Sequence, residues 1–542
     1  MTVNLVAATV TLPDTTYSRS LGAHLGDVVN VKDFGARGDN AHDDTAAIQA
    51  AINYAFGPPD DPHGYVLPDG PTQNRALFFP PGYYKVSSPY APWTITNCTN
   101  AGGYIRLTVA STAGLIEGDI VFVRGVTGTT YANACFGVFN LTATQFTLRG
   151  STFNAAWTGG GTFTVAALQV RDVMGGHIYG SGRYASIIYC EDFHTAAIAT
   201  NGFSFSKVEN IGFAAETGGI AFDLNADGGG LNLQSNQFNN VQFGGTGSAT
   251  PKYGVTIGMG QQMGSENSFL TCYYSGTEAG MYVANFNSLS NSVIGGNFSA
   301  CKIGIHVAAG SCPIIQGVGF QNYQVAGQIA DIYIANGAGD SYLISGCRTE
   351  SSNFIKSGPT LNYSVLGCAQ TTSASEPLTG GVGAFFAGSG YVTLSGCQSN
   401  LGYIQGNAYL MIDNCSFGDP NYLFGGGFGI NLGFLQITPM PVTTQTGTTY
   451  TMHCSDGGSR VLFNNASPIT VTLSGAGGFQ LGPGSKIEVQ QTGAGQVTFA
   501  GASGLTINSR GGRLKLAGQH ASATLTCVVA NTAWVLEGDV TT

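Results

Sequence analysis

The hexapeptide VENIGF, residues 208–213, is one copy of the pattern that decides the fold. The pattern is an apolar residue, any residue, a small Gly, Asn or Cys, two residues of any kind, and often Phe. It recurs as FNNVQF at 238, LTCYYS at 270, IGGNFS at 294, IQGVGF at 315, ISGCRT at 344, VLGCAQ at 365, LSGCQS at 394 and IDNCSF at 412. Copies start 18 to 32 residues apart, and such self-similarity is the signature of a repeat architecture.

Each copy is followed by a second short strand-like segment with alternating side chains. The segments include GIAFDLN at 219, GVTIGMG at 254, GMYVANF at 280, GIHVAAG at 304, DIYIANG at 331 and GYIQGN at 402. Two or three short strands per repeat, separated by Gly and Asn turns, predict the coils of a parallel β-helix stacked at about 4.8 Å. A propeller would need a more uniform period of about 40 residues.

The pattern also predicts which side chains face the core. If the first residue of a copy points inward, the fourth does too, after a bend at the small third residue. The predicted inward fourth positions are Ile211, Val241, Tyr273, Asn297, Val318, Cys347, Cys368, Cys397 and Cys415. The last four are expected to stack as unbridged core thiols, since buried free cysteine behaves as a small hydrophobe. The twelve cysteines show no CxxC pair and no Cys/His metal spacing.

Composition narrows the class of protein. The chain has 542 residues, 81 of them Gly, with only 9% charged and 43% hydrophobic residues, which favours a rigid all-β protein of three or four structural units. A formal charge of −10 without a basic face excludes nucleic-acid binding. No apolar stretch reaches 18 residues and no basic region precedes an apolar run, so we expect no membrane span, no signal peptide and folding in a cytoplasm.

Residues 30–55, NVKDFGARGDNAHDDTAAIQAAINYA, concentrate the acids Asp33, Asp39, Asp43 and Asp44 in a chain that is poor in charge. Asp43 or Asp44 can accept hydrogen bonds at a helix start, and apolar residues follow at i, i+4 spacing. A short helix here would cover the open first coil. We therefore expect these acids to be structural rather than catalytic.

This stretch, followed by LFFPPGYYKV at 77–86, resembles the start of the pectate-lyase-like right-handed parallel β-helix superfamily, typical of bacteriophage tailspike and tail-fibre depolymerases. Residues near 94–165 resemble a small β-barrel insert of tail proteins. The C-terminal region, with alternating strands KIEVQQ and QVTFAG, resembles a β-sandwich that ends tailspikes. The expected domains are an arm (1–29), a cap helix and first coil (30–93), the inserted β-domain (94–165), the β-helix (166–440) and the sandwich (441–542), with a junction near 436–449.

The resemblance implies a homotrimeric spike in the virion tail, made in the host cytoplasm and attached to tail or baseplate proteins through the N-terminal arm. It implies endo-cleavage of a bacterial capsule, exopolysaccharide or O-antigen, without cofactor or metal. Hydrolysis by paired carboxylates is the first expectation. The alternatives are a polysaccharide lyase with a general base, a binding-only receptor fibre, and a free pectin-degrading enzyme, which the tail-like C-terminus disfavours.

The candidate site lies on the outer face of the second strands. Their outward middle positions are Ala221, Thr256, Tyr282, His306 and Tyr333. The candidate catalytic residues are Glu278, Asp331, Glu350 and His306. The candidate substrate-binding residues are Tyr282, Tyr333, Arg348, Tyr274 and Lys302. The plainer interpretations are an ordinary aromatic stack or trimer interface, and a Glu278–Lys302 salt bridge. Weaker candidates are Glu209, Asp223, Glu266, Asp413, His177 and His194.

Overall fold

The computed structural model divides into two compact units, Met1–Ala338 and Gly339–Thr542, which are described separately. It describes residues 9–11, 18–20, 27–57, 75–225, 232–245, 247–258, 264–284, 287–322, 325–336, 341–358, 361–371, 384–399, 404–405, 408–413, 415–417, 424–425, 440–474, 481–530 and 532–542. Most of the predicted N-terminal arm and the start of the predicted junction lie outside these residues. Within the arm, β1 (Thr9–Thr11) and β2 (Ser18–Ser20) form an antiparallel pair.

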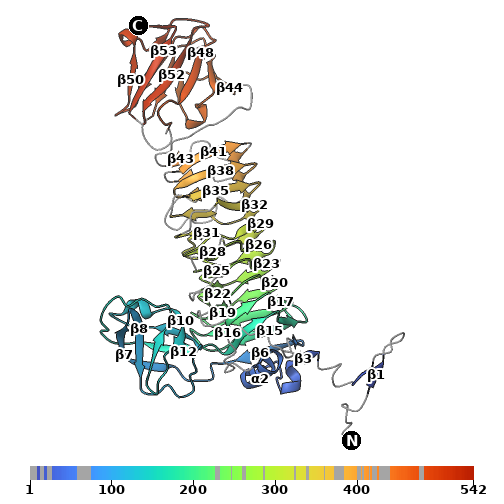
Figure 1. The fold of residues 1–542 in the computed structure, drawn as a ribbon. Helices are drawn as coiled ribbons and strands as arrows, with labels where there is room; N and C mark the ends of the chain where they lie inside the picture. Colours follow the sequence, from blue (N-terminus) through green and yellow to red (C-terminus); the bar gives the residue numbers. More distant parts are fainter. Residues whose placement is uncertain are drawn as a thin grey trace. The chain divides into compact units, whose positions relative to one another are not determined.

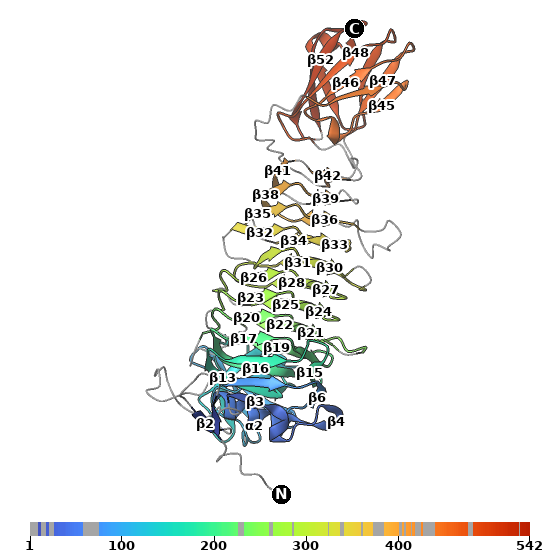
Figure 2. The ribbon, with the colours of Figure 1, turned by 90° about the vertical axis from the view of Figure 1, so that its right-hand side faces the viewer.

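The first unit contains three parallel sheets, and each coil after the first supplies one strand to each sheet (Figures 1 and 2). Sheet 1 consists of β13 (Leu168–Met174), β16 (Ala196–Ser204), β19 (Ile220–Leu224), β22 (Tyr253–Ile257), β25 (Ala279–Val283), β28 (Ile303–Val307) and β31 (Ala330–Ile334). Sheet 2 consists of β3 (Val28–Asn30), β5 (Ala76–Phe79), β14 (His177–Gly180), β17 (Lys207–Glu209), β20 (Gln237–Asn239), β23 (Ser268–Leu270), β26 (Ser292–Ile294) and β29 (Ile314–Gln316). Sheet 3 consists of β4 (Asp39–Asp43), β6 (Gly82–Val86), β15 (Ser186–Cys190), β18 (Gly212–Ala215), β21 (Gln242–Gly244), β24 (Tyr273–Ser275), β27 (Asn297–Ser299) and β30 (Gly319–Gln321). The predicted parallel β-helix is confirmed.

Stacked aromatic rings fill the interior of these coils. Under sheet 3, Phe243 stacks on Tyr274 (5.3 Å between ring centroids), Tyr274 on Phe298 (4.1 Å) and Phe298 on Phe320 (5.2 Å). All four side chains are fully buried. Because identical faces recur in every coil, the rings form one continuous column along the axis.

This column corrects the predicted register in two copies of the repeat. Strand β24 pairs Tyr274 with the buried Phe243, so Tyr274 lies in the core and Tyr273 faces outward. Likewise Ile294 is 40% exposed while its neighbour Val293 is buried. A slip of one residue moves every side chain of a strand to the other face. The copies therefore start at 269 and 293, Cys272 and Gly296 take the fourth position, and Asn297 faces outward.

The cap precedes and covers the first coil. It comprises η1 (Val31–Phe34) and α2 (Thr45–Phe56), whose buried face is Ile48, Ala51, Ile52 and Ala55. Gln49 on α2 exchanges two hydrogen bonds with the backbone of Gln169 on β13, both 2.9 Å. The predicted capping helix is confirmed.

The acids of the cap are held by the local backbone. Asp44 is buried and accepts from the backbone N–H groups of Arg37 (2.8 Å) and Gly38 (2.9 Å). Asp39 accepts from the N–H groups of Ala41 and His42, both 3.0 Å. These two acids are structural, as predicted.

An inserted barrel stands between β6 and β13. Its strands are β7 (Trp93–Ala101), β8 (Tyr104–Val109), β9 (Ile120–Arg124), β10 (Cys135–Phe139), β11 (Gln145–Leu148) and β12 (Thr162–Val165), with η2 (Thr130–Ala132) before β10. They close in the order β10-β11-β8-β7-β12-β9. Ile120 and Cys135 of the barrel share a buried cluster with Ala196, Ala199 and Ile220 of sheet 1. The barrel thus packs on the outer face of the early strands of sheet 1.

The second unit repeats the three-strand coil. Its sheets are β32 (Ser341–Ser345), β35 (Leu361–Leu366), β38 (Gly390–Ser395) and β41 (Ala408–Asp413); β33 (Arg348–Thr349), β36 (Ala369–Gln370), β39 (Gln398–Ser399) and β42 (Ser416–Phe417); and β34 (Ile355–Ser357), β37 (Phe386–Ala387), β40 (Ile404–Gln405) and β43 (Phe424–Gly425). Cys347, Cys368 and Cys397 are buried, Cys415 is half-buried, and none of the four is in a disulfide. The Cys397 N–H donates to Cys415 Sγ at 3.3 Å, which confirms the predicted thiol column.

The C-terminal part is a two-sheet sandwich. One sheet contains β44 (Val442–Gln445), β46 (Arg460–Phe463), β48 (Lys486–Gln491), β52 (Ser522–Val529), β53 (Ala533–Gly538) and β50 (Thr506–Ser509). The other contains β45 (Thr449–Thr451), β47 (Ile469–Leu473), β49 (Val497–Gly501), β51 (Lys515–Leu516) and β54 (Val540–Thr541), and the short helices are η4 (Cys454–Asp456) and η5 (Arg510–Gly512). The predicted sandwich is confirmed. Among the described residues, no helix has the length and apolarity needed to span a membrane.

Candidate functional site

Three ring side chains lie in register on the outer face of sheet 1. Tyr282 on β25 pairs with His306 on β28, and His306 pairs with Tyr333 on β31. Their ring centroids are 5.1 and 5.0 Å apart, and all three residues are half-buried. Because side chains alternate along a strand, the neighbouring residues point into the core. The predicted neighbourhood of these three rings is confirmed, and we call them the ring row.

The ring row begins on a buried tyrosine. Tyr253 at the start of β22 stacks on Tyr282 with 4.1 Å between ring centroids and an angle of 11°. Burial raises the pKa of both phenols, and burial lowers the pKa of His306. The imidazole is therefore neutral at neutral pH, and the ring row presents uncharged rings to the solvent.

The prediction that Ala221 continues the row is wrong, because Ala221 is buried and Asp223 takes this position on β19. Thr256 pairs with Tyr282, and Asp223 pairs with Thr256. Both are fully buried, because the barrel covers this part of sheet 1 through Cys135, whose Sγ contacts the Asp223 carboxylate at 3.6 Å. The exposed rings thus start where the barrel ends.

Charged side chains line the turns that lead from sheet 3 into sheet 1. These turn residues, which we call the turn column, are Glu191, Asp192, Glu216, Lys252, Glu278 and Lys302. Glu278 and Lys302 form the predicted ion pair, with 3.4 Å between Oε1 and Nζ and side chains 50% and 40% exposed. The Glu278 charge is one of the causes, after burial and the neighbouring Tyr282, that raise the pKa of Tyr253. Glu278 therefore lies beside the beginning of the ring row.

Two predicted site residues are inside the protein instead. Asp331 is fully buried, and its carboxylate accepts from Asn322 Nδ2 (2.8 Å) and Gln328 Nε2 (3.4 Å). Tyr274 is part of the core column. Neither side chain can contact a polymer on the surface, so Asp331 cannot be the second carboxylate beside Glu278 on this face.

The remaining predicted site residues, Arg348 and Glu350, belong to the second unit. Arg348 Nη2 and Glu350 Oε1 are 3.0 Å apart, with side chains 67% and 26% exposed. Of the weaker candidates, Glu209 forms ion pairs with His177 (2.9 Å) and Lys207 (2.7 Å) on the outer face of sheet 2. Such mutually satisfied pairs are typical of structural surface contacts.

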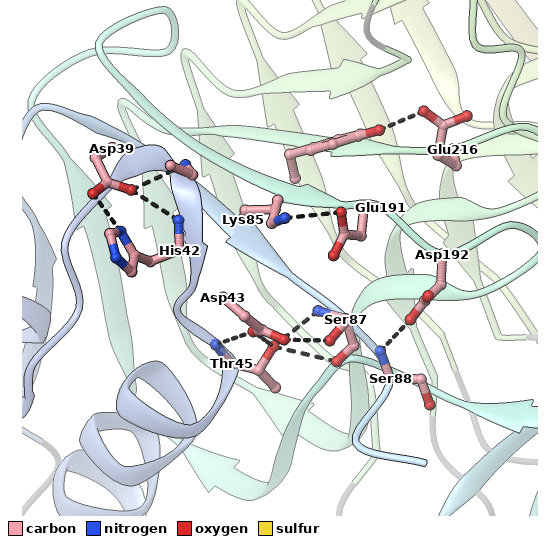
Figure 3. A network of polar contacts seen from close by, with 12 residues as sticks. Asp39, His42, Asp43, Thr45, Lys85, Ser87, Ser88, Glu191, Asp192 and Glu216 are labelled. Atoms are coloured by element: carbon pink, nitrogen blue, oxygen red, sulfur yellow. Dashed lines mark hydrogen bonds and ion pairs between the residues drawn. The ribbon is translucent and has the colours of Figure 1, made fainter. Parts of the chain in front are cut away.

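At the first turns of the turn column, Glu191, Asp192 and Glu216 lie near Asp43 of the cap (Figure 3). Lys85 Nζ contacts Glu191 Oε2 at 3.0 Å, and the Ser88 N–H donates to Asp192. Ser87 Oγ donates to Asp43 Oδ2 at 2.5 Å. The hydroxyl of Tyr189 donates to Glu216.

The pKa values of two of these acids move in opposite directions. Burial, together with the charges of Glu191 and Asp43, raises the pKa of Asp192. Burial also acts to raise the pKa of Asp43, but hydrogen bonds from Ser87 and Thr45 outweigh it and lower the value. A carboxyl group whose pKa is raised by burial and by neighbouring carboxylates is suited to act as a proton donor.

Sequence reasoning missed Glu191, Asp192 and Glu216. Glu191 and Asp192 lie in one turn and Glu216 lies in the turn of the next coil, and only the stacking of β15 on β18 brings the two turns together. The available signal was positional, because an acid directly follows the last residue of each of these strands, Cys190 and Ala215.

Residues 28–97 match the family model described as rhamnogalacturonase A/epimerase, pectate lyase-like. This confirms the resemblance seen in residues 30–86. A probable glucan endo-1,3-beta-glucosidase of Arthroderma benhamiae is 37% identical over 92 residues, which are 17% of this chain and 10% of that protein. The chain thus spans about a tenth of the length of this curated relative.

Solved structures also resemble the chain, among them these two. ORF18 of Geobacillus virus E2 has 14% identity and a TM-score of 0.36, with 96% of this chain and 77% of that chain covered. The tailspike gp61 of Pseudomonas phage phi297 has 13% identity and a TM-score of 0.27, with 87% of each chain covered.

Proposed function

We propose, from the pectate-lyase-like match of residues 28–97 and the ring row on the β-helix that follows, that this chain binds and cleaves a bacterial surface polysaccharide as a phage tail spike. The ring row carries the proposal. A sugar ring has an apolar face that packs on aromatic side chains, and rings repeating at the spacing of coils suit a polymer. Lys302 and Glu278 beside the ring row can hydrogen-bond to the hydroxyl groups of the polymer.

Cleavage is assigned to the carboxylates at the start of the turn column. Asp192, whose pKa is raised, is the proton donor to the leaving oxygen. Glu191, paired with Lys85, supplies the second carboxylate that glycoside hydrolysis requires. Asp192 precedes the coil of Tyr282 by three coils, about 14 Å at the spacing of parallel strands. One polysaccharide chain along the turn column could therefore reach both groups.

β-Elimination is the second candidate, favoured by one observation. His306 is a neutral imidazole on the ring row, and Lys302 lies on the same coil to neutralise a uronate. This route needs a uronic-acid polymer and would use neither Asp192 nor Glu191.

The test compares matched variants on a polysaccharide that the wild-type chain binds. Asp192→Asn keeps an acceptor for the Ser88 N–H and should lower reducing-end release by about 10²- to 10⁴-fold. His306→Gln should weaken binding and leave turnover of bound polymer nearly unchanged. An unsaturated, ultraviolet-absorbing product that disappears in His306→Gln and persists in Asp192→Asn would establish elimination. Binding of the polysaccharide without new reducing ends or unsaturated product would support a receptor fibre that only binds.

A further inference from the structure

A pocket of about 820 Å³ lies between the cap, the barrel and the first strand of sheet 1. Its wall includes Asn53 of α2, Tyr90 and Asp119 of the barrel side, and Arg171 of β13. The volume falls within the roughly 300–1,000 Å³ typical of small-molecule sites. All of these residues belong to the first unit, and the function proposed above does not use them.

Two polar atoms in this wall are buried without a hydrogen-bond partner among the described residues: Ser88 Oγ and Arg171 Nε. The Arg171 side chain is only 7% exposed. Its other nitrogens are occupied, because Nη1 donates to the Glu117 carbonyl (3.0 Å) and Nη2 to Gln169 Oε1 (2.6 Å) and to the Asp119 carboxylate. Buried polar groups are almost always hydrogen-bonded, so two unsatisfied groups in one pocket point to a polar occupant.

The pocket also contains a fixed aromatic ring. Tyr90 is 38% exposed, and its ring lies against Gly114, where an added Cβ would come within 2.5 Å of Tyr90 Cε1. Trp93 supports it from the barrel, with 5.1 Å between ring centroids. A rigid ring beside hydroxyl, amide and carboxylate groups suits a ligand that has both an apolar face and many hydroxyl groups.

We infer that this pocket binds one or two units of a neutral saccharide, with the sugar face on Tyr90 and hydroxyl groups on Ser88 and Arg171. The charge of Arg171 is balanced by Asp119, and Asp43, which also lines the pocket, has a lowered pKa and repels anions. The ligand is therefore uncharged. This inference goes beyond the proposed function, because the pocket binds whether or not a bond is cleaved.

The test is calorimetric titration of the full chain with maltose, cellobiose and glucuronate. A neutral disaccharide should bind saturably, and Arg171→Lys, which keeps the charge toward Asp119 but lacks Nε–H, should bind about three- to tenfold more weakly. Ser88→Ala should show a similar loss. Tyr104→Ala, which removes an exposed ring elsewhere on the barrel (41% exposed), is the control and should bind normally.

Several outcomes overturn the inference. If neither neutral disaccharide gives saturable heat up to about 20 mM, a millimolar site is excluded. If glucuronate binds more tightly than the disaccharides, the ligand is not neutral. Unchanged affinity in a folded Arg171→Lys or Ser88→Ala protein would place binding elsewhere. Loss of disaccharide binding in Tyr282→Ala would assign it to the ring row instead, so failure here is distinguishable from failure of the proposed function.

Discussion

At the scale of single residues, Asp223 shows how the barrel is joined to the β-helix. The carboxyl group is fully buried on the outer side of sheet 1. It accepts from Thr256, from Asn225 Nδ2 at 3.4 Å and from the thiol of Cys135 on the barrel at 3.6 Å. Burial raises its pKa to about 6, and these hydrogen bonds limit the rise. The group is thus protonated in mildly acidic solution.

The stability of the first unit should therefore fall as pH rises through this pKa. Between the ordinary 3.8 and the raised value of about 6, the native state binds more protons than the unfolded state, so the free energy of unfolding declines by up to about 3 kcal/mol. We expect Asp223→Asn to lose this decline. Denaturant unfolding of both proteins at pH 4 and pH 7.5 measures it, and the same pH slope in the two proteins would refute the assignment.

At the scale of elements, an asparagine ladder ties the coils together before sheet 2. Asn236, Asn267 and Asn291 are buried. Asn267 Oδ1 accepts from Asn236 Nδ2 at 2.9 Å, while Asn267 Nδ2 donates to Asn291 Oδ1 and to the Leu233 carbonyl, both at 3.0 Å. These hydrogen bonds therefore join successive coils at the same position.

Removing the middle rung should be costly. Asn267→Ala removes the side-chain partner of the buried Asn236 backbone N–H and of the Leu233 carbonyl, which we expect to destabilise the first unit by roughly 3 kcal/mol or more. The matched control is Asn239→Ala, a half-buried outward residue whose loss should change little. Thermal unfolding measures the loss of stability in both variants. Equal losses would show that the asparagine ladder does not stabilise the coils more than an outward asparagine does.

The elements also show why the sequence predicted the coils better than the site. The apolar and small positions of the repeat are read along the chain, so the coils, the cap and the thiol column could be predicted. The two slipped copies, at 270 and 294, have apolar residues at adjacent positions, so the pattern alone cannot choose the register and Tyr274 was placed outside. Asp331 was misplaced because neighbouring side chains, Asn322 and Gln328, bury it.

At the scale of the whole molecule, the outer face of sheet 2 supports the proposal of a homotrimer. Ile294 and Ile314, on neighbouring strands of this sheet, are 40% and 44% exposed. Exposed apolar groups on one face are typical of subunit interfaces. The acids that lie close together depend on how coils stack and how copies of the chain associate. For this reason Asp192 and Glu191 could not be selected from the sequence.

Replacing both isoleucines by glutamate should break the assembly. Light scattering should give about three times the chain mass of 55.9 kDa for the wild-type protein and about one chain mass for Ile294→Glu/Ile314→Glu. The control is Ile329→Glu, because Ile329 is similarly exposed (38%) but lies outside sheet 2. This variant should keep the mass of three chains. A trimer that survives the double substitution would place the interface elsewhere.

The most direct test of the account is the affinity of the ring row for polysaccharide. The dissociation constant of a polysaccharide retained by the wild-type chain should rise at least about tenfold in Tyr282→Ala/Tyr333→Ala, the equivalent of about 1.4 kcal/mol. It should stay unchanged in Tyr131→Ala, which removes a ring that is 62% exposed on the barrel. Undiminished affinity in the folded double variant would contradict the claim that this face of the β-helix holds the polymer.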